Sequence, residues 1–328
     1  MTRSTIPSRP SAAGWCFKFV AKLFVTALLL PGSAFSQANN AVTRKTGATQ
    51  WTQFNCETGL QLRLTSSHPS QGSLELVEIR SYSTLRKVVG KWDGKEIPFW
   101  QVTDSGHQPV DRQRALIGID LQHPAGSYDF AVSGEIAEGH AFTCVASLTV
   151  KEGRFATEKL NVAPQFVEPN PEQLARADEE RKRLREIFAT VTPERLWSGA
   201  FRLPLTGVST GGNFGKRRVL NGEPSSPHSG VDFPAPAGTA VHATQVGRVV
   251  LAEPLYFSGN TVVIDHGLGV YTLYGHLSSF SVIAGDAVKA GELIGKVGAT
   301  GRVTGPHLHW GLTVNAAHVN SLDIVRLL

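Results

Sequence analysis

The pair His307 and His309 is the first place in the chain where residue type and spacing suggest chemistry. Residues two apart in a β-strand point to the same face, so both imidazoles of Gly305-Pro306-His307-Leu308-His309 project together. Two imidazoles are costly to bury side by side unless a metal or an acidic group accompanies them. The motif alone leaves a metal or catalytic site and a ladder of surface histidines equally open.

His228 and Asp232 form a second motif, His228-Ser229-Gly230-Val231-Asp232. Prolines before and after the motif exclude a helix, so we expect His228 on a loop that enters a strand and Asp232 at the start of that strand. Imidazole and carboxylate ligands suit zinc, and three protein ligands with a fourth position open are typical of catalytic zinc sites. Taken singly, either residue is more simply a turn histidine or a turn-capping aspartate.

With Tyr274-Gly275-His276-Leu277-Ser278, these motifs resemble the lysostaphin-like (LytM-type) zinc endopeptidases. The pattern of that family is His-x-x-x-Asp followed much later by His-x-His. The resemblance covers roughly residues 201–319 in one unbroken order. It also includes Gly238-Thr239-Ala240-Val241, Asp265-His266-Gly267, Gly285-Asp286 and Gly298-Ala299-Thr300-Gly301.

The resemblance implies one zinc ion per chain, held by His228, Asp232 and His309. It further implies that His307 is the general base and that His276 is a second catalytic histidine, which holds the attacking water or the developing oxyanion. The implied reaction is hydrolysis of peptide bonds in the stem peptides or crosslinks of bacterial peptidoglycan, by a water molecule that the metal activates.

Several basic and histidine side chains fall outside this set. Lysostaphin has a tyrosine shortly before its first ligand, and residues 221–227 contain none. Arg217 or Arg218 could bind a substrate carboxylate, although an exposed arginine is the simpler interpretation. His242, His266 and His318 occupy no catalytic motif position and are predicted to be structural.

Two rival functions remain to be weighed. The glycines of residues 286–298 also resemble the half-barrel of biotinyl and lipoyl carrier domains, but that function needs a lysine at a hairpin tip and leaves the motif histidines unexplained. The other alternative is a wall-binding LytM-type regulator that activates another cell-wall hydrolase. Such regulators typically lose ligands, whereas all three ligands are present here.

The predicted fold is mainly β. Residues 199–328, the predicted metallopeptidase domain, contain short strands with glycine at most corners, including a hairpin from 261–264 and 270–274, which indicates a tightly turned antiparallel sheet. Residues 41–165 alternate apolar and polar side chains, most strictly at Leu60, Leu62 and Leu64, and predict an immunoglobulin-like β-sandwich. Its histidines are predicted to be solvated loop residues: His68, His107, His123 and His140.

Residues 166–198 are predicted to be a helical linker. Asn170 is a good N-cap and Pro171 suits the first turn, so a helix should run from 171 to about 189, with an apolar stripe that includes Leu174 and Phe188. Thr192-Pro193 predicts a second short helix. We interpret the charged face of the first helix as a solvated spacer.

The first 36 of the 328 residues have the composition of a secretory signal. Four basic residues precede the apolar run 23–30, the first 36 residues contain no acidic residue, and small residues before Gln37 suit cleavage. A retained membrane anchor is the alternative, although the apolar run is short for a span. We therefore expect export to the periplasm or cell envelope, with no stable membrane span after cleavage.

The net charge of +5 at first suggests nucleic acid, but four of those charges belong to the signal. The remaining chain is near neutral and has no basic stripe, so nucleic-acid binding is not expected. Cleavage would leave two cysteines, Cys56 and Cys144. A disulfide and two free buried thiols are both compatible with an exported protein.

Overall fold

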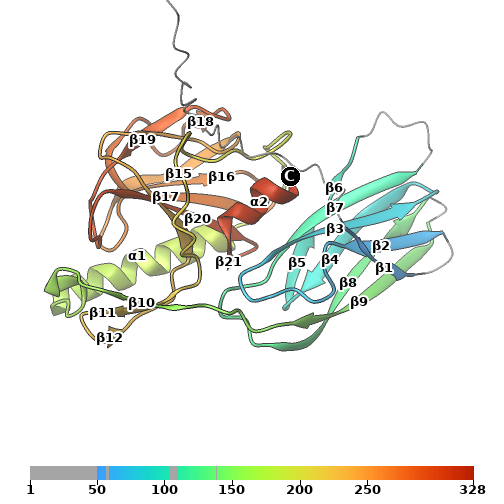
Figure 1. The fold of residues 1–328 in the computed structure, drawn as a ribbon. Helices are drawn as coiled ribbons and strands as arrows, with labels where there is room; N and C mark the ends of the chain where they lie inside the picture. Colours follow the sequence, from blue (N-terminus) through green and yellow to red (C-terminus); the bar gives the residue numbers. More distant parts are fainter. Residues whose placement is uncertain (1–49, 57–58, 104–109, 138) are drawn as a thin grey trace, which may run out of the picture. The chain divides into compact units, whose positions relative to one another are not determined.

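The computed structural model describes residues 50–56, 59–103, 110–137 and 139–328, and these residues are mainly β (Figure 1), as predicted. The helices of this part are α1 (Pro171–Ala189) and α2 (Ser321–Leu327), with a 3-10 turn at Pro164–Phe166. Neither helix is long and apolar enough to cross a membrane. The predicted signal, residues 1–36, lies outside the described residues.

Two antiparallel sheets come from the first half of the described chain. One has the strand order β1-β2-β3-β7-β6 and the other β5-β4-β8-β9. The strands are β1 (Thr52–Asn55), β2 (Leu60–Leu64), β3 (Leu74–Ser81), β4 (Leu85–Trp92), β5 (Lys95–Pro98), β6 (Trp100–Gln101), β7 (Asp111–Gly118), β8 (Gly126–Ile136) and β9 (Ala141–Val150). Both sheets contribute to one core, in which Leu62, Ile79, Phe130 and Leu148 are fully buried. The immunoglobulin-like class of this pair of sheets stays a prediction.

A disulfide joins Cys56, just after β1, to Cys144 in β9, with the two Cα atoms 5.3 Å apart. The two cysteines lie 88 residues apart in sequence, and the bond links the end of a strand of one sheet to a strand of the other. The structure therefore has the crosslink and not the two free thiols.

The last third of the chain forms a nine-stranded sheet, whose main path is β13-β20-β17-β16-β15-β18. The strands are β13 (Gly230–Pro234), β14 (Ala240–His242), β15 (Gly247–Leu255), β16 (Gly259–Asp265), β17 (Val270–Phe280), β18 (Ala287–Val288), β19 (Leu293–Val297), β20 (His307–Val314) and β21 (Ala317–Val319). β16 and β17 form the predicted hairpin. Phe233, Tyr274 and Trp310 are fully buried in its core, so the strands that carry the histidine motifs are held rigidly.

A small third sheet was not expected from the sequence. β10 (Thr157–Leu160) pairs in parallel with β11 (Arg217–Leu220), which pairs in turn with β12 (Glu223–Pro224). The register places Glu158 directly beside Arg218. A segment that precedes α1 in the sequence thus lies next to β11, the strand that comes before the motif of His228 and Asp232.

Helix α1 begins as predicted. The Asn170 side chain accepts from the Gln173 amide while the Gln173 side chain accepts from the Asn170 amide, which is a capping box. Phe188 is buried against Leu251 and Tyr271, so this end of the helix packs on the nine-stranded sheet and is not a spacer. Leu174, expected in the apolar stripe, is instead 45% exposed.

The second helix predicted from Thr192 is wrong, because residues 190–200 contain no helix. This stretch is held in an extended form by the sheet: the amide of Leu196 donates to the carbonyl of His266, and the amide of Leu268 donates to that of Thr192. Trp197 is buried edge-on against Trp100, with ring centroids 5.5 Å apart. Tertiary hydrogen bonds therefore replaced those of a short helix.

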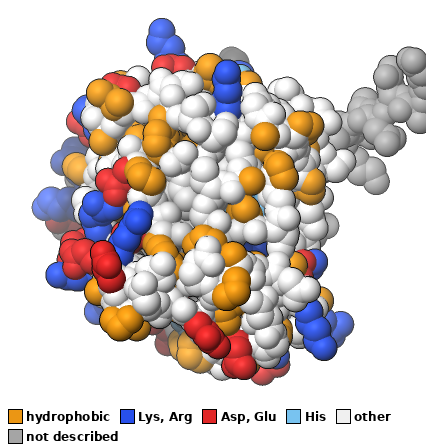
Figure 2. Space-filling model, turned by 90° about the vertical axis from the view of Figure 1, so that its left-hand side faces the viewer, with side chains coloured by type: hydrophobic (Ala, Val, Ile, Leu, Met, Phe, Trp, Pro, Cys, Tyr) orange, Lys and Arg blue, Asp and Glu red, His pale blue; other side chains and the backbone are white. Residues whose placement is uncertain are grey.

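Residues 48–328 form one compact unit. Asn315 Nδ2 donates to the carbonyl of Leu116 at 3.1 Å, and the amide of His318 donates to Asp120 Oδ2 at 2.8 Å. The turn after β20 is therefore bonded to β7, and β21 is bonded to the loop after β7. On the face drawn in Figure 2, side chains of both charge signs are interspersed.

Candidate active site

Three donor atoms from the two histidine motifs converge on one point. His228 Nε2 lies 3.1 Å from Asp232 Oδ1 and 2.9 Å from His309 Nδ1, and the last two atoms are 3.0 Å apart. In a tetrahedral zinc site each donor lies about 2.0 to 2.2 Å from the ion, so neighbouring donors lie about 3.3 Å apart. The set therefore fits a small divalent ion in both size and donor type, and two nitrogens with one carboxylate oxygen suit zinc.

The pairing of β13 with β20 brings the motifs together. Asp232 and His309 are direct partners in this antiparallel pair, and the buried His228 lies on the loop just before β13. Asp232 lies in the middle of its strand, whereas the sequence had predicted it at the start. A Cβ on Gly230 would lie 2.6 Å from the His309 ring and 2.8 Å from the carbonyl of Trp310, so only glycine allows this approach.

Backbone carbonyls orient three of the histidines. Nδ1 of His228 lies 3.0 Å from the carbonyl of Asn213, and Nδ1 of His276 lies 2.8 Å from that of Thr300. Nδ1 of His307 lies 2.8 Å from the carbonyl of Gly305. A carbonyl can only accept, so Nδ1 carries the proton in each ring and Nε2 presents a lone pair. Nε2 is the His228 atom that meets the other two donors.

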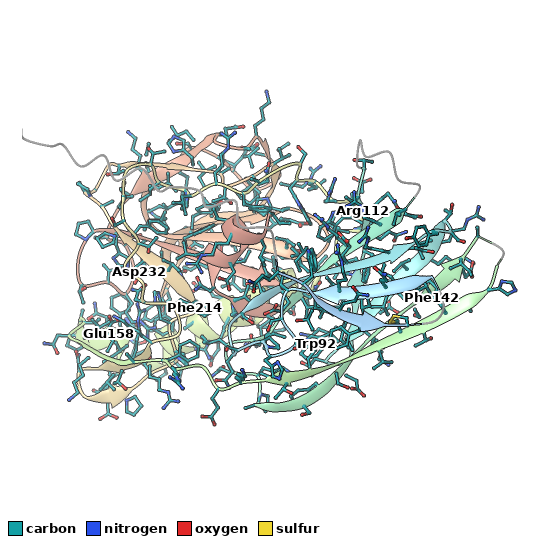
Figure 3. All side chains as sticks on the ribbon, turned by 45° about the vertical axis from the view of Figure 1, so that its right-hand side comes forward. Trp92, Arg112, Phe142, Glu158, Phe214 and Asp232 are labelled. Carbon is teal, nitrogen blue, oxygen red and sulfur yellow. A yellow bond between two sulfur atoms is a disulfide. The ribbon has the colours of Figure 1, made fainter. Side chains whose placement is uncertain are left out.

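The carboxylate of Asp232 divides its two oxygens between two tasks. Oδ1 faces the histidines, while Oδ2 accepts from Asn213 Nδ2 at 2.7 Å and from an Arg218 N–H at 3.1 Å. Arg218 also approaches Glu158 Oε2 at 3.7 Å, and Figure 3 shows Glu158 and Asp232 in the same part of the structure. The expectation of an exposed arginine is wrong for Arg218, whose side chain is only 17% exposed.

The protonation states follow from burial. Burial alone would raise the pKa of Asp232, but the close approach of His228 and His309 outweighs it and holds that pKa well below its usual range. Burial, reinforced by the neighbouring His309, lowers the pKa of His228 to about 4. Burial also lowers the pKa of His276 to about 3, with His309 and His307 adding to the shift. At neutral pH the site thus offers a carboxylate at Asp232 and neutral imidazoles at His228 and His276; carboxylate and neutral imidazole are the forms that bind metal.

His276 and His307 flank the three donors. Their ring centroids are 4.8 Å apart, and the His276 centroid is 5.9 Å from that of His309. His307 Nε2 lies 3.7 Å from Asp232 Oδ1. His276 has a φ of +63°, a conformation that is uncommon for a residue with a side chain. Its amide donates to the carbonyl of Ser258 at 2.7 Å, which holds that conformation.

Open space adjoins the cluster on two sides. A cavity of about 170 Å³ is lined by His228, His276 and His309, and another of about 190 Å³ by Asp232 and His307. A larger groove of about 870 Å³ runs past α1 and β12. Arg302 lines all three spaces.

Three residues of this environment were not predicted from the sequence, namely Asn213, Glu158 and Arg302. Asn213 contacts Asp232 and His228 from 19 and 15 positions away, and Glu158 reaches the site only through the β10–β11 pairing. Arg302 stands five positions before His307, in a loop without periodicity. The closeness of Arg302 to His307 and His309 in sequence was the one available signal.

The remaining histidines lie elsewhere. His266 is fully buried, with Nδ1 2.7 Å from the carbonyl of Val246 and Nε2 2.7 Å from the Thr272 hydroxyl. His123, expected to be solvated, is buried and stacks on Trp92 with ring centroids 5.6 Å apart. His107 lies outside the described residues.

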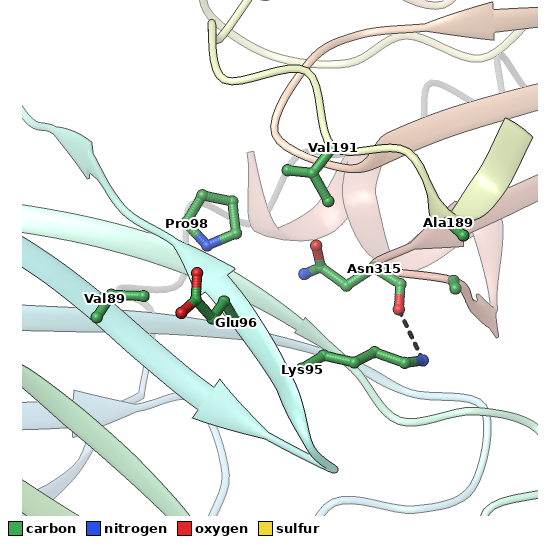
Figure 4. A pocket seen from close by; sticks show the side chains of 8 residues that line it. Val89, Lys95, Glu96, Pro98, Ala189, Val191 and Asn315 are labelled. Atoms are coloured by element: carbon green, nitrogen blue, oxygen red, sulfur yellow. Dashed lines mark hydrogen bonds between the residues drawn. The ribbon is translucent and has the colours of Figure 1, made fainter.

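A further pocket of about 470 Å³ lies away from these groups. Its lining includes Val89, Lys95, Pro98 and Val191 (Figure 4), and no histidine. Lys95 Nζ donates across it to the carbonyl of Asn315 at 3.1 Å. The described residues that line it include a single carboxylate, Glu96, and form no group of convergent metal-ligating side chains like the histidine cluster.

Comparison with known proteins gives a consistent family. The profile of peptidase family M23 matches residues 226–321, which contain all five clustered residues. DD-carboxypeptidase/endopeptidase Mpg of Neisseria meningitidis is 46% identical over 97 residues, which are 30% of this chain and 22% of that protein. Peptidoglycan DD-endopeptidase ShyC of Vibrio cholerae is 34% identical over 205 residues, which are 62% of this chain and 46% of that protein. The chain thus spans less than half of each of these relatives.

A solved structure extends the likeness beyond the matched segment. A Pseudomonas aeruginosa protein assigned to peptidase M23 is 28% identical, with a TM-score of 0.57 over 79% of this chain and 96% of that one. That coverage reaches well before residue 226, so the preceding sheets share in the likeness. The chain therefore carries a peptidase family M23 domain, of the lysostaphin-like type that its histidine motifs resemble.

Proposed function

We propose that this protein is a zinc-dependent endopeptidase that hydrolyses peptide bonds in the stem peptides or crosslinks of peptidoglycan. The observation that carries the proposal is the convergence of His228 Nε2, Asp232 Oδ1 and His309 Nδ1 within 3.1 Å of one another. These three residues are the proposed ligands of one divalent ion. The names of the two relatives support this substrate class: both are named endopeptidases, and that of ShyC names peptidoglycan.

The proposed chemistry divides between the ion and the side chains. A bound zinc ion supplies a Lewis acid and lowers the pKa of a coordinated water toward about 7. Asp232 offsets part of the ion's charge, and its second oxygen is held by Asn213 and Arg218. His307 presents an Nε2 lone pair beside the donors, so it takes the proton from the attacking water and passes it to the leaving amine.

His276 has the narrower task of holding the water. Its Nδ1–H is used by the carbonyl of Thr300, and its lowered pKa keeps Nε2 unprotonated at neutral pH. An unprotonated Nε2 can accept a hydrogen bond but cannot donate one to an oxyanion. Of the two roles that the family resemblance allows, this geometry favours positioning of the attacking water.

We also propose that the protein works outside the cytoplasm, in the periplasm or cell envelope, after cleavage of residues 1–36. A substrate in the cell wall requires export, and the basic and apolar pattern of the first 36 residues supports it. We further propose that the rest of the chain is divided as its sequence pattern predicts. The parts are an immunoglobulin-like domain (41–165), a helical linker (166–198) and a metallopeptidase domain (199–328).

Digestion of purified peptidoglycan, followed by mass spectrometry of the fragments, tests the activity and identifies the bond together. The zinc-loaded protein is expected to release new amino termini. A chelator should abolish release, and His307→Ala should reduce it about 100- to 10,000-fold because proton transfer is lost. His307→Ala should keep its metal, whereas His309→Ala should lose it.

The metal analysis separates this proposal from its rival. A protein that holds one zinc ion yet cleaves no type of crosslink would contradict an enzymatic role. The regulatory alternative, a wall-binding protein that activates another hydrolase, would then be tested by adding that protein to a wall digest.

A further inference from the structure

Arg302 is a cationic side chain beside the active site without an acceptor in the described part of the chain. Its guanidinium lies over the Phe257 ring, with its central carbon 4.5 Å from the ring centroid. Its amide donates to the carbonyl of Phe257 at 2.8 Å. By contrast, Arg218 is paired with both Asp232 and Glu158. The five N–H donors of Arg302 are therefore available to a ligand.

The backbone around Arg302 fixes this position. A Cβ on the preceding Gly301, whose φ is +74°, would lie 2.4 Å from the amide of Gly259 and 2.6 Å from the carbonyl of Phe257. Glycine thus lets the loop press against the turn that carries Phe257. The aromatic ring then supports the flat face of the guanidinium, which leaves its edge to make hydrogen bonds.

The open space that Arg302 faces belongs to the reaction site. It shares the cavity of about 170 Å³ with His228, His276 and His309, and no carboxylate is among the described residues that line this cavity. It also lines the groove of about 870 Å³ that continues from the site past β12 and α1. A peptide bound along the groove would pass Arg302 next to its scissile bond.

The local field favours an anion there. Burial, together with the charges of Arg218 and Arg181, lowers the pKa of Arg302 to about 10, so the neighbouring charges that shift this guanidinium are positive. Arg302 remains a cation at neutral pH. A guanidinium in partly desolvated surroundings binds a carboxylate through two parallel hydrogen bonds, which are stronger than neutral ones.

We propose that Arg302 is a specificity-determining residue that binds a free carboxylate of the substrate peptide beside the scissile bond. The inference rests on the proposed peptidase function and deepens it: the preferred substrate class is an acidic peptide, and its carboxamide counterpart is a poor substrate. The carboxylate belongs either to the C-terminus of a peptide stem or to a residue within a crosslink. The chemistry at Arg302 is the same in both cases.

Synthetic crosslinked peptides that differ only in free or amidated carboxylates test this inference on the zinc-loaded full chain. One pair differs at the C-terminus and a second pair at an internal residue, so the pair that is discriminated identifies the carboxylate. The wild-type protein is expected to prefer one acidic peptide by roughly 10- to 100-fold in kcat/KM, the range for a hydrogen-bonded charge pair. Arg302→Gln should abolish that preference by losing only the activity toward the acidic peptide.

Two further variants separate binding from structure. Arg302→Lys keeps the charge without the fork and should retain part of the preference. Arg185→Gln, at an exposed position of α1, should behave as the wild type. Equal losses on the acidic and amidated peptides in Arg302→Gln, or no preference in the wild type for either pair, would overturn the inference.

A binding titration keeps this outcome distinct from failure of the proposed function. Two zinc-loaded proteins, the single variant His307→Ala and the double variant His307→Ala/Arg302→Gln, are titrated with labelled forms of the same peptides. Tighter binding of one acidic peptide, lost with Arg302→Gln, supports the inference even if no peptide is cleaved. Equal binding of all peptides overturns it.

Discussion

Asn213 holds two of the proposed metal ligands at once. Its side-chain nitrogen Nδ2 donates to Asp232 Oδ2, and its side-chain oxygen Oδ1 accepts from the backbone amide of Asp232. Its backbone carbonyl accepts from His228 Nδ1. The first two bonds depend on the side chain and the third does not. Outer partners of this kind orient metal ligands and set their basicity.

Asn213→Ala is expected to weaken zinc binding by about 10- to 100-fold, since Asp232 loses a donor that holds it in place. Competition with a chelator of known affinity measures the change. Thr304→Ala, at an exposed position on the rim of the same cavity, is the control and should bind zinc as the wild type does. Unchanged affinity in Asn213→Ala would mean that Arg218 alone is sufficient to hold the carboxylate.

His266 makes the stability of the sheet depend on pH. Burial lowers its pKa in the folded protein to about 4, whereas the unfolded chain has a histidine pKa near 6.5. As the pH falls below about 6.5 the unfolded state takes up the proton first, so stability is lost between about pH 6.5 and pH 4. The loss is on the order of 3 kcal/mol.

Urea unfolding at pH 7.5 and pH 5 measures this dependence. His266→Gln should be less stable than the wild type at pH 7.5 because it changes a fully buried position. It should lose less stability on acidification, since the titrating group is gone. Parallel losses in the two proteins would assign the pH dependence to other groups.

At the scale of elements, the antiparallel pair β13–β20 determines which residues meet. The register puts Asp232 opposite His309 and Gly230 opposite Gly311. A slip of one residue would turn either motif to the other face of the sheet. The fully buried Phe233 and Trp310 on these strands oppose such a slip, because their burial is lost with it.

Gly230→Ala should disturb the site through this strand pair. The added methyl group would lie 2.6 Å from the His309 ring and 2.8 Å from a carbonyl oxygen, so the ring or the strand must move. We expect a stability loss of about 1 to 3 kcal/mol and weaker zinc binding, measured by thermal unfolding and chelator competition. Gly305→Ala is the matched control, because a Cβ there meets no atom within 4 Å. Normal zinc affinity in Gly230→Ala would show that His309 tolerates the displacement.

At the scale of the whole molecule, the described chain is held by contacts between distant segments. The Cys56–Cys144 disulfide spans 88 residues, and hydrogen bonds tie Asn315 and His318 to β7 and the loop after it. The first two sheets and the nine-stranded sheet are therefore joined by hydrogen bonds as well as by the continuous chain.

The double variant Cys56→Ser/Cys144→Ser should lose about 4 to 5 kcal/mol of stability in the chain-entropy account, because a loop of this length is no longer closed in the unfolded state. Denaturant unfolding of the oxidised wild type and of the variant measures the difference. The folded variant should still bind one zinc ion, since the disulfide lies outside the histidine cluster. Equal unfolding midpoints would contradict a stabilising role for the disulfide.

Much of the fold was open to prediction because its signals are local. Alternation along β2, the Asn170 N-cap of α1 and the turn between β16 and β17 each depend on a few neighbouring residues. The short helix predicted from Thr192 failed because the sheet takes the hydrogen bonds of that segment. His123 was misplaced because burial against Trp92 depends on tertiary packing.

The sequence by itself determined the chemistry of the candidate site. His228, Asp232, His276, His307 and His309 were assigned from the family resemblance that their short motifs carry in combination, and residue type and strand spacing agree with that assignment. Only the tertiary structure decided what surrounds them: that Arg218 and Asn213 hold Asp232, that Glu158 joins through a parallel pairing, and that Arg302 lies over Phe257 beside the site. The physical reason is range. Side-chain chemistry and strand period act over a few residues, whereas these contacts join residues that come together only when the chain folds.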